Sequence, residues 1–451
     1  MASRGHLLLA LLVLAATAAA ASGGRHQSRV SKPARPRLEL VPAAPDASLA
    51  DRARDDVHRH AYIRSQLVSR RGRRAAEVGT SAFAMPLSSG AYTGTGQYFV
   101  RFRVGTPAQP FVLVADTGSD LTWVKCRGAG AAAGTGAGSP ARVFRTSASK
   151  SWAPIACSSD TCTSYVPFSL ANCSSPASPC AYDYRRSYRG GWLGRYKDGS
   201  AARGVVGTDS ATIALSSGSG GGGGDSSGRR AKLQGVVLGC TATYDGQSFQ
   251  SSDGVLSLGY SNISFASRAA ARFAFAPAPA AQTPLLLDRR MSPFYAVTVD
   301  AVCVAGEALD IPADVWDVDR NGGAILDSGT SLTILATPAY RAVVAALSKH
   351  LAGLPRVTMD PFEYCYNWTT ADGASAPEIP KLEVRFAGSA RLEPPAKSYV
   401  IDAAPGVKCI GVQEGSWPGV SVIGNILQQE HLWEFDLRDR WLRFKHTRCA
   451  L

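Results

Sequence analysis

The sequence feature that most constrains the fold is a short pattern that occurs twice, once in each half of the chain. The letters FVLVADTGS fill residues 111–119, and GAILDSGTS fills residues 323–331. Each copy is an apolar run, typical of a buried strand, followed by Asp, a hydroxyl residue, Gly and a second hydroxyl residue. The Gly lets the backbone turn tightly behind the carboxyl group. Ser119 or Thr330 can donate a hydrogen bond to that group.

A single copy would be most simply an ordinary turn at the end of a strand, but two copies favour a twofold arrangement. That arrangement would bring the carboxyl groups of Asp116 and Asp327 face to face. Two such groups ~3 Å apart cannot both ionise, so one keeps a proton and the other is a base. The pair could deprotonate a water molecule and protonate a peptide carbonyl in one step. We therefore take Asp116 and Asp327 as candidate catalytic residues, and this chemistry implies no metal and no organic cofactor.

The rest of the chain predicts a mainly β protein that is long enough for two domains. It has 451 residues, of which 45% are hydrophobic, and its 45 Gly and 26 Pro favour many turns. Residues 98–104 and 111–115 read as strands, and residues 338–351 have apolar side chains at helical spacing. The Gly/Ala segment 128–138 and the Gly/Ser segment 216–228 are expected to be surface loops.

The N-terminal 85 residues differ in character from the rest. Residues 1–22 have a basic start, an apolar run and small residues at its end, which is typical of a secretory signal. Residues 23–85 carry 13 Arg and Lys against 6 Asp and Glu, an excess of 7 out of the whole chain's +13. We expect this segment to be a removable propeptide, with arginine pairs between residues 70 and 74 as processing sites. Because most of the basicity would be removed, we expect no nucleic-acid partner.

A helix is expected within the propeptide at residues 50–68. Its apolar positions are Val57, Ala61, Ile63, Leu67 and Val68. The apolar run at residues 7–21 is short for a bilayer, which needs ~20 apolar residues, and no later stretch is long and apolar enough to span one, so no membrane anchor is expected.

The ten cysteines are expected to form disulfides, because an exported chain meets an oxidising compartment. A zinc site is the alternative for the cluster at residues 157–180, but its spacings do not match paired zinc-ligand motifs. Three Asn-x-Ser/Thr sequences are candidate glycosylation sites: Asn172, Asn262 and Asn367.

These motifs resemble those of the pepsin family of aspartic proteases, and especially its plant nepenthesin-like branch. The resemblance is carried by ADTGSDLTWV at residues 115–124, ILDSGT at 325–330 and VIGN at 422–425. Gly105-Thr106-Pro107 precedes the first motif, and Phe435-Asp436 follows the last. The likeness extends from about residue 96 to residue 449.

The resemblance implies a bilobal β fold with an active-site cleft between an N-terminal lobe, residues 86–281, and a C-terminal lobe, residues 282–451. It implies a hairpin flap near residues 196–200, with Tyr196 and Gly199 as substrate-binding residues.

Trp123 would support Tyr196. Without the resemblance, Tyr196 would be an exposed turn residue and Trp123 a core residue. The segment 157–180 would be a cysteine-rich insert of the N-terminal lobe, and Cys365 would be joined to Cys409.

The chain departs from the family pattern at several places. Lys197 stands at the usual flap glycine, and Val255-Leu256-Ser257 replaces a segment that usually ends in Gly. Residues 272–277 replace a longer segment near the lobe junction, and residues 185–194 look like an insertion before the flap. None of these departures touches Asp116 or Asp327.

The resemblance implies a secreted aspartic endopeptidase that hydrolyses peptide bonds at acid pH. Its partners would be polypeptide substrates and pepstatin-type inhibitors, it would be a monomer, and its destination would be extracellular or vacuolar. The alternative is a non-catalytic pepsin-fold binding protein of the xylanase-inhibitor type. A third hypothesis is a basic binding protein that uses the arginine-rich segment. We also expect that segment to lie across the anionic cleft and to be released when acid protonates the carboxylates.

Overall fold

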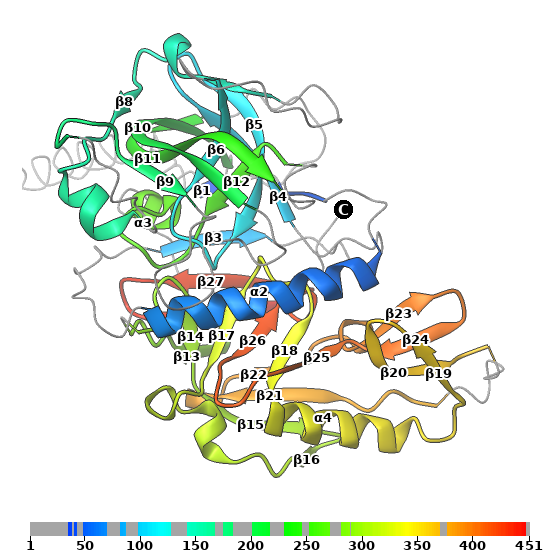
Figure 1. Ribbon diagram of the computed structural model, residues 1–451. Helices are drawn as coiled ribbons and strands as arrows, with labels where there is room; N and C mark the ends of the chain where they lie inside the picture. The colour runs from blue at the N-terminus through cyan, green and yellow to red at the C-terminus, as the bar shows by residue number, and fades with distance from the viewer. Residues whose placement is uncertain are drawn as a thin grey trace, which may run out of the picture.

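The apolar runs that predict strands form the sheets of two β-rich lobes, with one helix between the lobes (Figure 1). The protein is described from a computed structural model. The described residues are 35–37, 40–42, 48–69, 82–86, 98–127, 142–166, 175–183, 201–216, 230–245, 252–270, 281–288, 290–369 and 377–447.

The N-terminal lobe is built on one large sheet. Among the described residues this sheet has eleven strands, in the order β1-β10-β11-β6-β12-β5-β4-β2, while β7 pairs with β6 and both β8 and β9 pair with β10. The strands are β1 Arg35–Arg37, β2 Leu40–Pro42, β4 Tyr98–Val104, β5 Gln109–Asp116, β6 Trp123–Arg127, β7 Phe144–Arg145, β8 Ala153–Pro154, β9 Ala181–Asp183, β10 Ala201–Ser216, β11 Arg230–Asp245 and β12 Gly254–Ser257. The predicted strands at 98–104 and 111–115 are therefore β4 and most of β5.

Side chains from both faces of this sheet fill the N-terminal core. Phe102 of β4 contacts Phe265 of α3 (Phe265–Ala270) edge to face, with ring centroids 4.9 Å apart. Trp123 lies in a second cluster with Leu121 and Tyr182, and all three side chains are fully buried. This packing fixes the end of β5, where the first Asp motif begins.

The C-terminal lobe divides its strands among smaller sheets. The sheet nearest the cleft has the order β14-β17-β26-β18-β25, and two further sheets have the orders β16-β15-β21-β22 and β19-β20-β24-β23. The strands are β14 Tyr295–Val297, β15 Val299–Val304, β16 Glu307–Ala308, β17 Ala324–Asp327, β18 Thr333–Ala336, β19 Arg356–Met359, β20 Phe362–Asn367, β21 Leu382–Phe386, β22 Arg391–Leu392, β23 Val400–Ala404, β24 Val407–Ile410, β25 Val412–Gly415 and β26 Ser421–Gly424. The helix predicted at 338–351 is α4, Thr337–His350, which buries Val343, Val344 and Leu347.

A further sheet brings the ends of the chain together. Its order is β13-β28-β27-β3, formed by Ala281–Pro284, Trp441–His446, His431–Asp436 and Ala82–Pro86. β3 pairs antiparallel with β27 over its whole length. The expected end of the propeptide at residue 85 therefore falls inside a paired strand.

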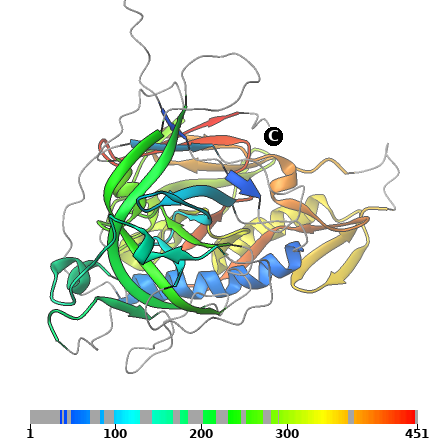
Figure 2. The same ribbon diagram turned by 90° about the horizontal axis from the view of Figure 1, so that it is seen from above.

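The helix between the lobes is α2, Leu49–Ser69. It includes the whole helix predicted at 50–68. Figure 1 shows it running across the molecule with the N-terminal lobe on one side and the C-terminal lobe on the other, and Figure 2 shows it along one edge of the molecule. Ser48 caps its first turn, because the Ser48 hydroxyl donates to Asp51 and accepts from the Asp51 N–H. No helix among the described residues is long and apolar enough to cross a membrane.

The disulfides lie within single lobes, and those of β6 with β11 and of β20 with β24 join neighbouring strands. They link Cys126 to Cys240, Cys162 to Cys180 and Cys365 to Cys409, and Cys157 is also disulfide-bonded. The Cys365–Cys409 pair is the one that the family resemblance implies. Cys303 differs from the expectation that every cysteine is bonded, because it is a free thiol buried in β15.

We predict that peptide mapping without reduction will find Cys365 linked to Cys409. Cys303 has an exposed fraction of 0%, so a thiol reagent should label it only after denaturation. Recovery of Cys365 in another disulfide, or rapid labelling of Cys303 in the folded protein, would contradict the structure.

Candidate active site

The two Asp residues of the repeated pattern stand at the ends of equivalent strands. β5 ends at Asp116 and pairs in parallel with β12, which places Ser257 opposite Asp116. β17 ends at Asp327 and pairs in parallel with β26, which places Gly424 opposite Asp327. Because both strands are internal in their sheets, each lobe delivers its Asp on a strand that is held on both sides.

The hydroxyl residues that follow the two Asp residues join the lobes. The Thr117 N–H donates to the Ser328 hydroxyl at 3.1 Å, and the Ser328 N–H donates to the Thr117 hydroxyl at 2.8 Å. Each hydroxyl also reaches a main-chain carbonyl of the other lobe: Ser328 donates to Ala115 at 2.9 Å, and Thr117 donates to Leu326 at 3.5 Å. No role was predicted for Thr117 or Ser328, although their matched places in the two copies of the sequence pattern were a usable signal.

The same turns hold the carboxyl groups. The Gly118 N–H donates to Asp116 Oδ1 at 2.9 Å, and the Gly329 N–H donates to Asp327 Oδ1 at 3.0 Å. Thr330 donates to Asp327 Oδ2 at 2.6 Å, as expected, whereas Ser119 donates to the main-chain carbonyl of Asp116 and not to its carboxylate.

Each carboxylate also lies against the glycine of the opposite turn. A Cβ atom at Gly118 would lie 2.7 Å from Asp327 Oδ1, and one at Gly329 would lie 2.6 Å from Asp116 Oδ1. No larger residue fits at either position without displacing a carboxylate. The twofold arrangement inferred from the repeat is therefore present.

The Arg59 side chain of α2 occupies the space in front of both carboxylates. Its Nη2 donates to Asp116 Oδ1 at 2.6 Å and to Asp327 Oδ1 at 3.0 Å. Its Nη1 donates to Asp116 Oδ2 at 3.0 Å, and its Nε donates to Asp327 Oδ2 at 2.9 Å. The Arg59 side chain is 13% exposed and those of Asp116 and Asp327 are 3% and 0% exposed, so all three charges are shielded from water.

Burial and charge act on these groups in opposite directions. Burial raises the pKa of Asp327 and the nearby Asp116 carboxylate adds to the rise, while the Arg59 cation opposes it. Burial acts to lower the pKa of Arg59, but the charges of Asp116 and Asp327 outweigh burial and the net pKa is raised. Arg59 therefore remains a cation, and Asp327 takes up a proton at a higher pH than an ordinary carboxyl group.

The rest of α2 binds mainly to the C-terminal lobe. Asp56 accepts hydrogen bonds from the Ser331 and Leu332 N–H groups, and Gln413 donates to the Ala53 carbonyl at 2.7 Å. His60 contacts the Val420 carbonyl at 3.0 Å through its Nε2.

Ile63 is fully buried in a cluster with Met291, Phe294, Ile325 and Val422. The face of α2 that meets this lobe thus mixes apolar and charged side chains.

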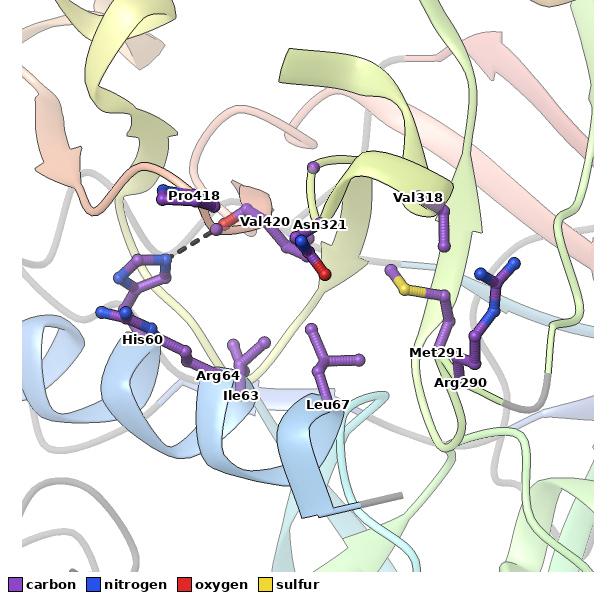
Figure 3. Close-up of a pocket in the computed structure, with 12 residues that line it drawn as sticks. His60, Ile63, Arg64, Leu67, Arg290, Met291, Val318, Asn321, Pro418 and Val420 are labelled. Atoms are coloured by element: carbon purple, nitrogen blue, oxygen red, sulfur yellow. Dashed lines mark hydrogen bonds between the residues drawn. The ribbon is translucent and has the colours of Figure 1, made fainter. Parts of the chain in front are cut away.

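A cavity of about 210 Å³ lies between α2 and the C-terminal lobe (Figure 3). His60, Ile63 and Leu67 of α2 line it on one side, and Met291 and Val420 of the lobe line it on the other. Neither Asp116 nor Asp327 lines this cavity, and the space directly in front of the two carboxylates is filled by Arg59.

The other predicted site residues are distributed as follows. Trp123 is fully buried on β6, and Asn262 and Asn367 are partly exposed. Tyr196, Gly199, Lys197 and Asn172 lie outside the described residues. Within the described ranges, no group of three or more His, Cys, Asp or Glu side chains is arranged to hold a metal ion.

Comparison with protein families matches nearly all of the two lobes. A family model described as Xylanase inhibitor N-terminal matches residues 98–278, and one described as Xylanase inhibitor C-terminal matches residues 294–446.

Curated relatives include one from Arabidopsis thaliana and two from Nepenthes gracilis. "Aspartyl protease family protein 2" of Arabidopsis is 29% identical, over 90% of this chain and 82% of the relative. "Aspartic proteinase nepenthesin-2" of Nepenthes gracilis is 28% identical, over 80% of this chain and 79% of the relative. "Aspartic proteinase nepenthesin-1" of the same species is 26% identical, over 81% of this chain and 80% of the relative.

Solved structures share the fold. "Crystal structure of edgp" has a TM-score of 0.59 at 18% identity and covers 83% of this chain and 96% of its own. "Crystal structure of Basic 7S globulin from soybean" has a TM-score of 0.55 at 17% identity, with coverage of 82% and 96%. At these identities the likeness concerns the fold alone.

We predict that the Arg59→Gln substitution will loosen α2 at neutral pH, because it leaves two buried carboxylates facing each other without a cation. Amide hydrogen exchange over residues 49–69 should accelerate by about tenfold or more, since removing one partner of a buried ion pair is strongly destabilising. Arg64→Gln is the matched control, because Arg64 is exposed and makes one hydrogen bond, to Ser416. Equal exchange in the two variants would contradict a central role for Arg59.

Proposed function

Because the chain belongs to the pepsin-like aspartic protease family, in its plant nepenthesin-like branch, we propose that it is an aspartic endopeptidase with Asp116 and Asp327 as its catalytic carboxyls. The observation that carries the proposal is the symmetrical placement of these carboxyls at the meeting point of the lobes. Each one is oriented by the glycine N–H of its own turn and lies against the glycine of the other.

The proposed reaction needs one water molecule and one shared proton. Once Arg59 has left, a water molecule can lie between the carboxyls in its place. The ionised carboxyl takes a proton from this water as the oxygen attacks the peptide carbonyl carbon, and the protonated carboxyl gives its proton to the carbonyl oxygen. The resulting tetrahedral intermediate collapses with transfer of a proton to the leaving nitrogen, which breaks the C–N bond. Thr330 and the two glycine N–H groups keep the carboxyls oriented throughout.

A non-catalytic binding protein of the xylanase-inhibitor type is the second candidate. It is favoured by the descriptions of the two family models. Retention of both Asp residues with their hydrogen-bonded turns favours the protease instead. The two candidates differ in whether the purified protein cleaves an unfolded polypeptide.

The protease is proposed to be made as a latent precursor. In this form the Arg59 side chain occupies the position that the attacking water requires, and α2 covers the cleft. Acidification protonates carboxyl groups, beginning at a higher pH for Asp327 because its pKa is raised. Each proton removes a negative partner of Arg59, so the contact weakens as the pH falls. Residues 23–81 are released at this step, and the paired strand β3 stays with the enzyme.

The remaining parts of the proposal come from the sequence and the family. Residues 1–22 direct the protein into the secretory pathway, to an extracellular or vacuolar destination, and Asn262 and Asn367 are its candidate glycosylation sites among the described residues. The mature enzyme is proposed to be a monomer that closes a flap carrying Tyr196 and Gly199 over polypeptide substrates.

We predict that Asp116→Asn and Asp327→Asn will each lower kcat by about a hundredfold or more, because the two carboxyls act as one acid–base unit. The measurement is cleavage of an unfolded protein at pH ~4, where one proton on the pair is expected. Pepstatin should inhibit the unsubstituted enzyme. Retention of most activity in either folded variant would refute the assignment, and absence of any cleavage would favour the binding protein.

We predict that the precursor will become active at pH ~4 but not at pH ~7, with a new N-terminus between Arg70 and Ala82. Sequencing of the product and a fluorogenic peptide assay measure the two effects. Arg59→Gln should shift the onset of activity to higher pH, whereas Arg64→Gln should not. Full activity of the intact precursor at neutral pH would contradict the latent state.

A further inference from the structure

The two copies of the Asp motif differ in the bond that their last hydroxyl residue makes. Thr330 donates to the Asp327 carboxylate at 2.6 Å, whereas Ser119 donates to the main-chain carbonyl of Asp116 at 3.4 Å. Apart from the bonds of Arg59, each carboxylate accepts from the glycine N–H of its own turn. Within the described residues, only the Asp327 carboxylate also accepts from a hydroxyl group. The Asp116 carboxylate therefore has one hydrogen bond fewer.

The strand residue opposite each Asp also differs between the copies. Ser257 of β12 lies opposite the first Asp, and Gly424 of β26 lies opposite the second. The Ser257 N–H donates to the Thr122 hydroxyl at 3.0 Å. The Gly424 N–H donates in the same way to the Thr333 hydroxyl at 3.3 Å, so the two positions are equivalent. The copy that has a side chain at this position is the one whose turn hydroxyl does not reach the carboxylate.

No side chain fits at Gly424 without displacing the second turn. A Cβ atom there would lie 2.4 Å from the Leu332 carbonyl oxygen and 2.7 Å from the Ser331 carbonyl oxygen. The turn packs directly on its strand, and the Asn425 N–H donates to the Thr330 carbonyl at 2.8 Å. In a turn held in this way, the Thr330 hydroxyl reaches the carboxylate.

The Ser257 side chain changes the same contacts in the first turn. Its hydroxyl is fully buried and donates to the Ser119 carbonyl at 2.5 Å. The next residue, Leu258, donates through its N–H to the Asp116 carbonyl at 2.8 Å, and the Gly259 N–H donates to the Ser119 carbonyl at 3.2 Å. The Ser257 hydroxyl thus takes the place that a main-chain N–H has in the second turn, and the Ser119 hydroxyl is left on the main chain.

We infer that Ser257 is a positioning residue that keeps the Ser119 hydroxyl from the Asp116 carboxyl and so moves the pH range of the proposed hydrolysis upward. A hydrogen bond to a carboxylate stabilises its ionised form, so a pair of carboxyls with one such bond fewer keeps its protons to a higher pH. Ser257 acts through Ser119 and not on the substrate. This inference rests on the proposed protease function.

A substitution at residue 257 leaves the charged groups around the Asp116 carboxyl unchanged. Asp327 faces it from the opposite turn, and Arg59 faces it from α2, which leaves in the proposed activation. Asp120 is buried in the same turn as Asp116. Because none of these charges is altered, a shift of the pH range in such a variant reports a hydrogen bond and not a change of charge.

The first experiment measures the pH–rate profile of the acid-activated enzyme with Ser257→Gly. Loss of the hydroxyl frees the Ser119 carbonyl, so the first turn can pack as the second does and the Ser119 hydroxyl can reach Asp116. An added bond to an ionised carboxyl lowers the sum of the acid and alkaline midpoints, whichever carboxyl ionises first. The expected fall is about one pH unit, the size of one hydrogen bond to a charged group.

An unchanged or increased sum in the folded variant would overturn the inference. Ser257→Ala removes the same hydroxyl without adding the backbone freedom of glycine, and it should shift the sum in the same direction. Absence of any cleavage by the unsubstituted enzyme would refute the proposed function instead.

The double variant Ser257→Gly with Ser119→Ala is the matched control. It lacks the hydroxyl that Ser257→Gly releases, so its midpoints should lie within about 0.3 pH unit of those of Ser119→Ala alone. A role of Ser257 in packing alone would shift the profile equally with and without the Ser119 hydroxyl. That result would also overturn the inference.

A further measurement does not depend on catalysis. Carbon-13 NMR of the carboxyl carbons follows the titration of Asp116 and Asp327 in the acid-treated protein, with Asp116→Asn used to assign the signals. The sum of their two midpoints should fall by about one pH unit in Ser257→Gly and not in the double variant. An unchanged sum would overturn the inference. A fall of the sum in a protein that cleaves no peptide would support the positioning of Ser119 by Ser257 and refute only the proposed function.

Discussion

Two carboxyl groups with the same charge are buried side by side between two lobes, and the structure around them compensates their repulsion. Main-chain N–H groups of Gly118 and Gly329 and the hydroxyl of Thr330 hydrogen-bond to them, and Arg59 supplies a positive charge. Thr117 and Ser328 tie the two turns together across the lobe boundary. A change in the position of either lobe would alter the bonds of Thr117 and Ser328 and the contacts of Arg59 together, since these are the ones that depend on groups from both lobes.

The repeated pattern made the centre of the molecule predictable from sequence. An apolar run that is followed by Asp, a hydroxyl residue and Gly restricts the local backbone strongly, because few conformations allow a buried strand to end in a charged turn. β5 and β17 accordingly end at the expected Asp residues, and the strand at 98–104 and the helix near 338–351 were also predicted. Whether these strands and this helix form depends mainly on residues that are neighbours in the chain, and a sequence pattern shows such residues directly.

The buried face of α2 could not be found in the same way. Val57 was counted as one of its apolar positions, yet Val57 is 57% exposed. Among the described side chains of α2, the buried residues are Arg52, Ala53, Asp56, His60 and Ile63, and three of these five are polar or charged. A search for an apolar stripe misses such a face, because Asp56 and Arg59 are stabilised by donors and acceptors that lie 57 or more residues away. The local sequence also does not distinguish Arg59 from the other Arg and Lys residues of the segment 23–85, which has 13 of them.

The connection between α2 and β3 adds a property that no single contact provides. β3 is held by β27, α2 is held by the C-terminal lobe, and residues 70–81 join the two elements. While this connection is intact, α2 rebinds its site in an intramolecular step, at an effective concentration in the millimolar range for a short linker. Once the connection is cut, the same contacts must hold two separate molecules together. Occupancy of the cleft then depends on protein concentration, so dilution alone opens it.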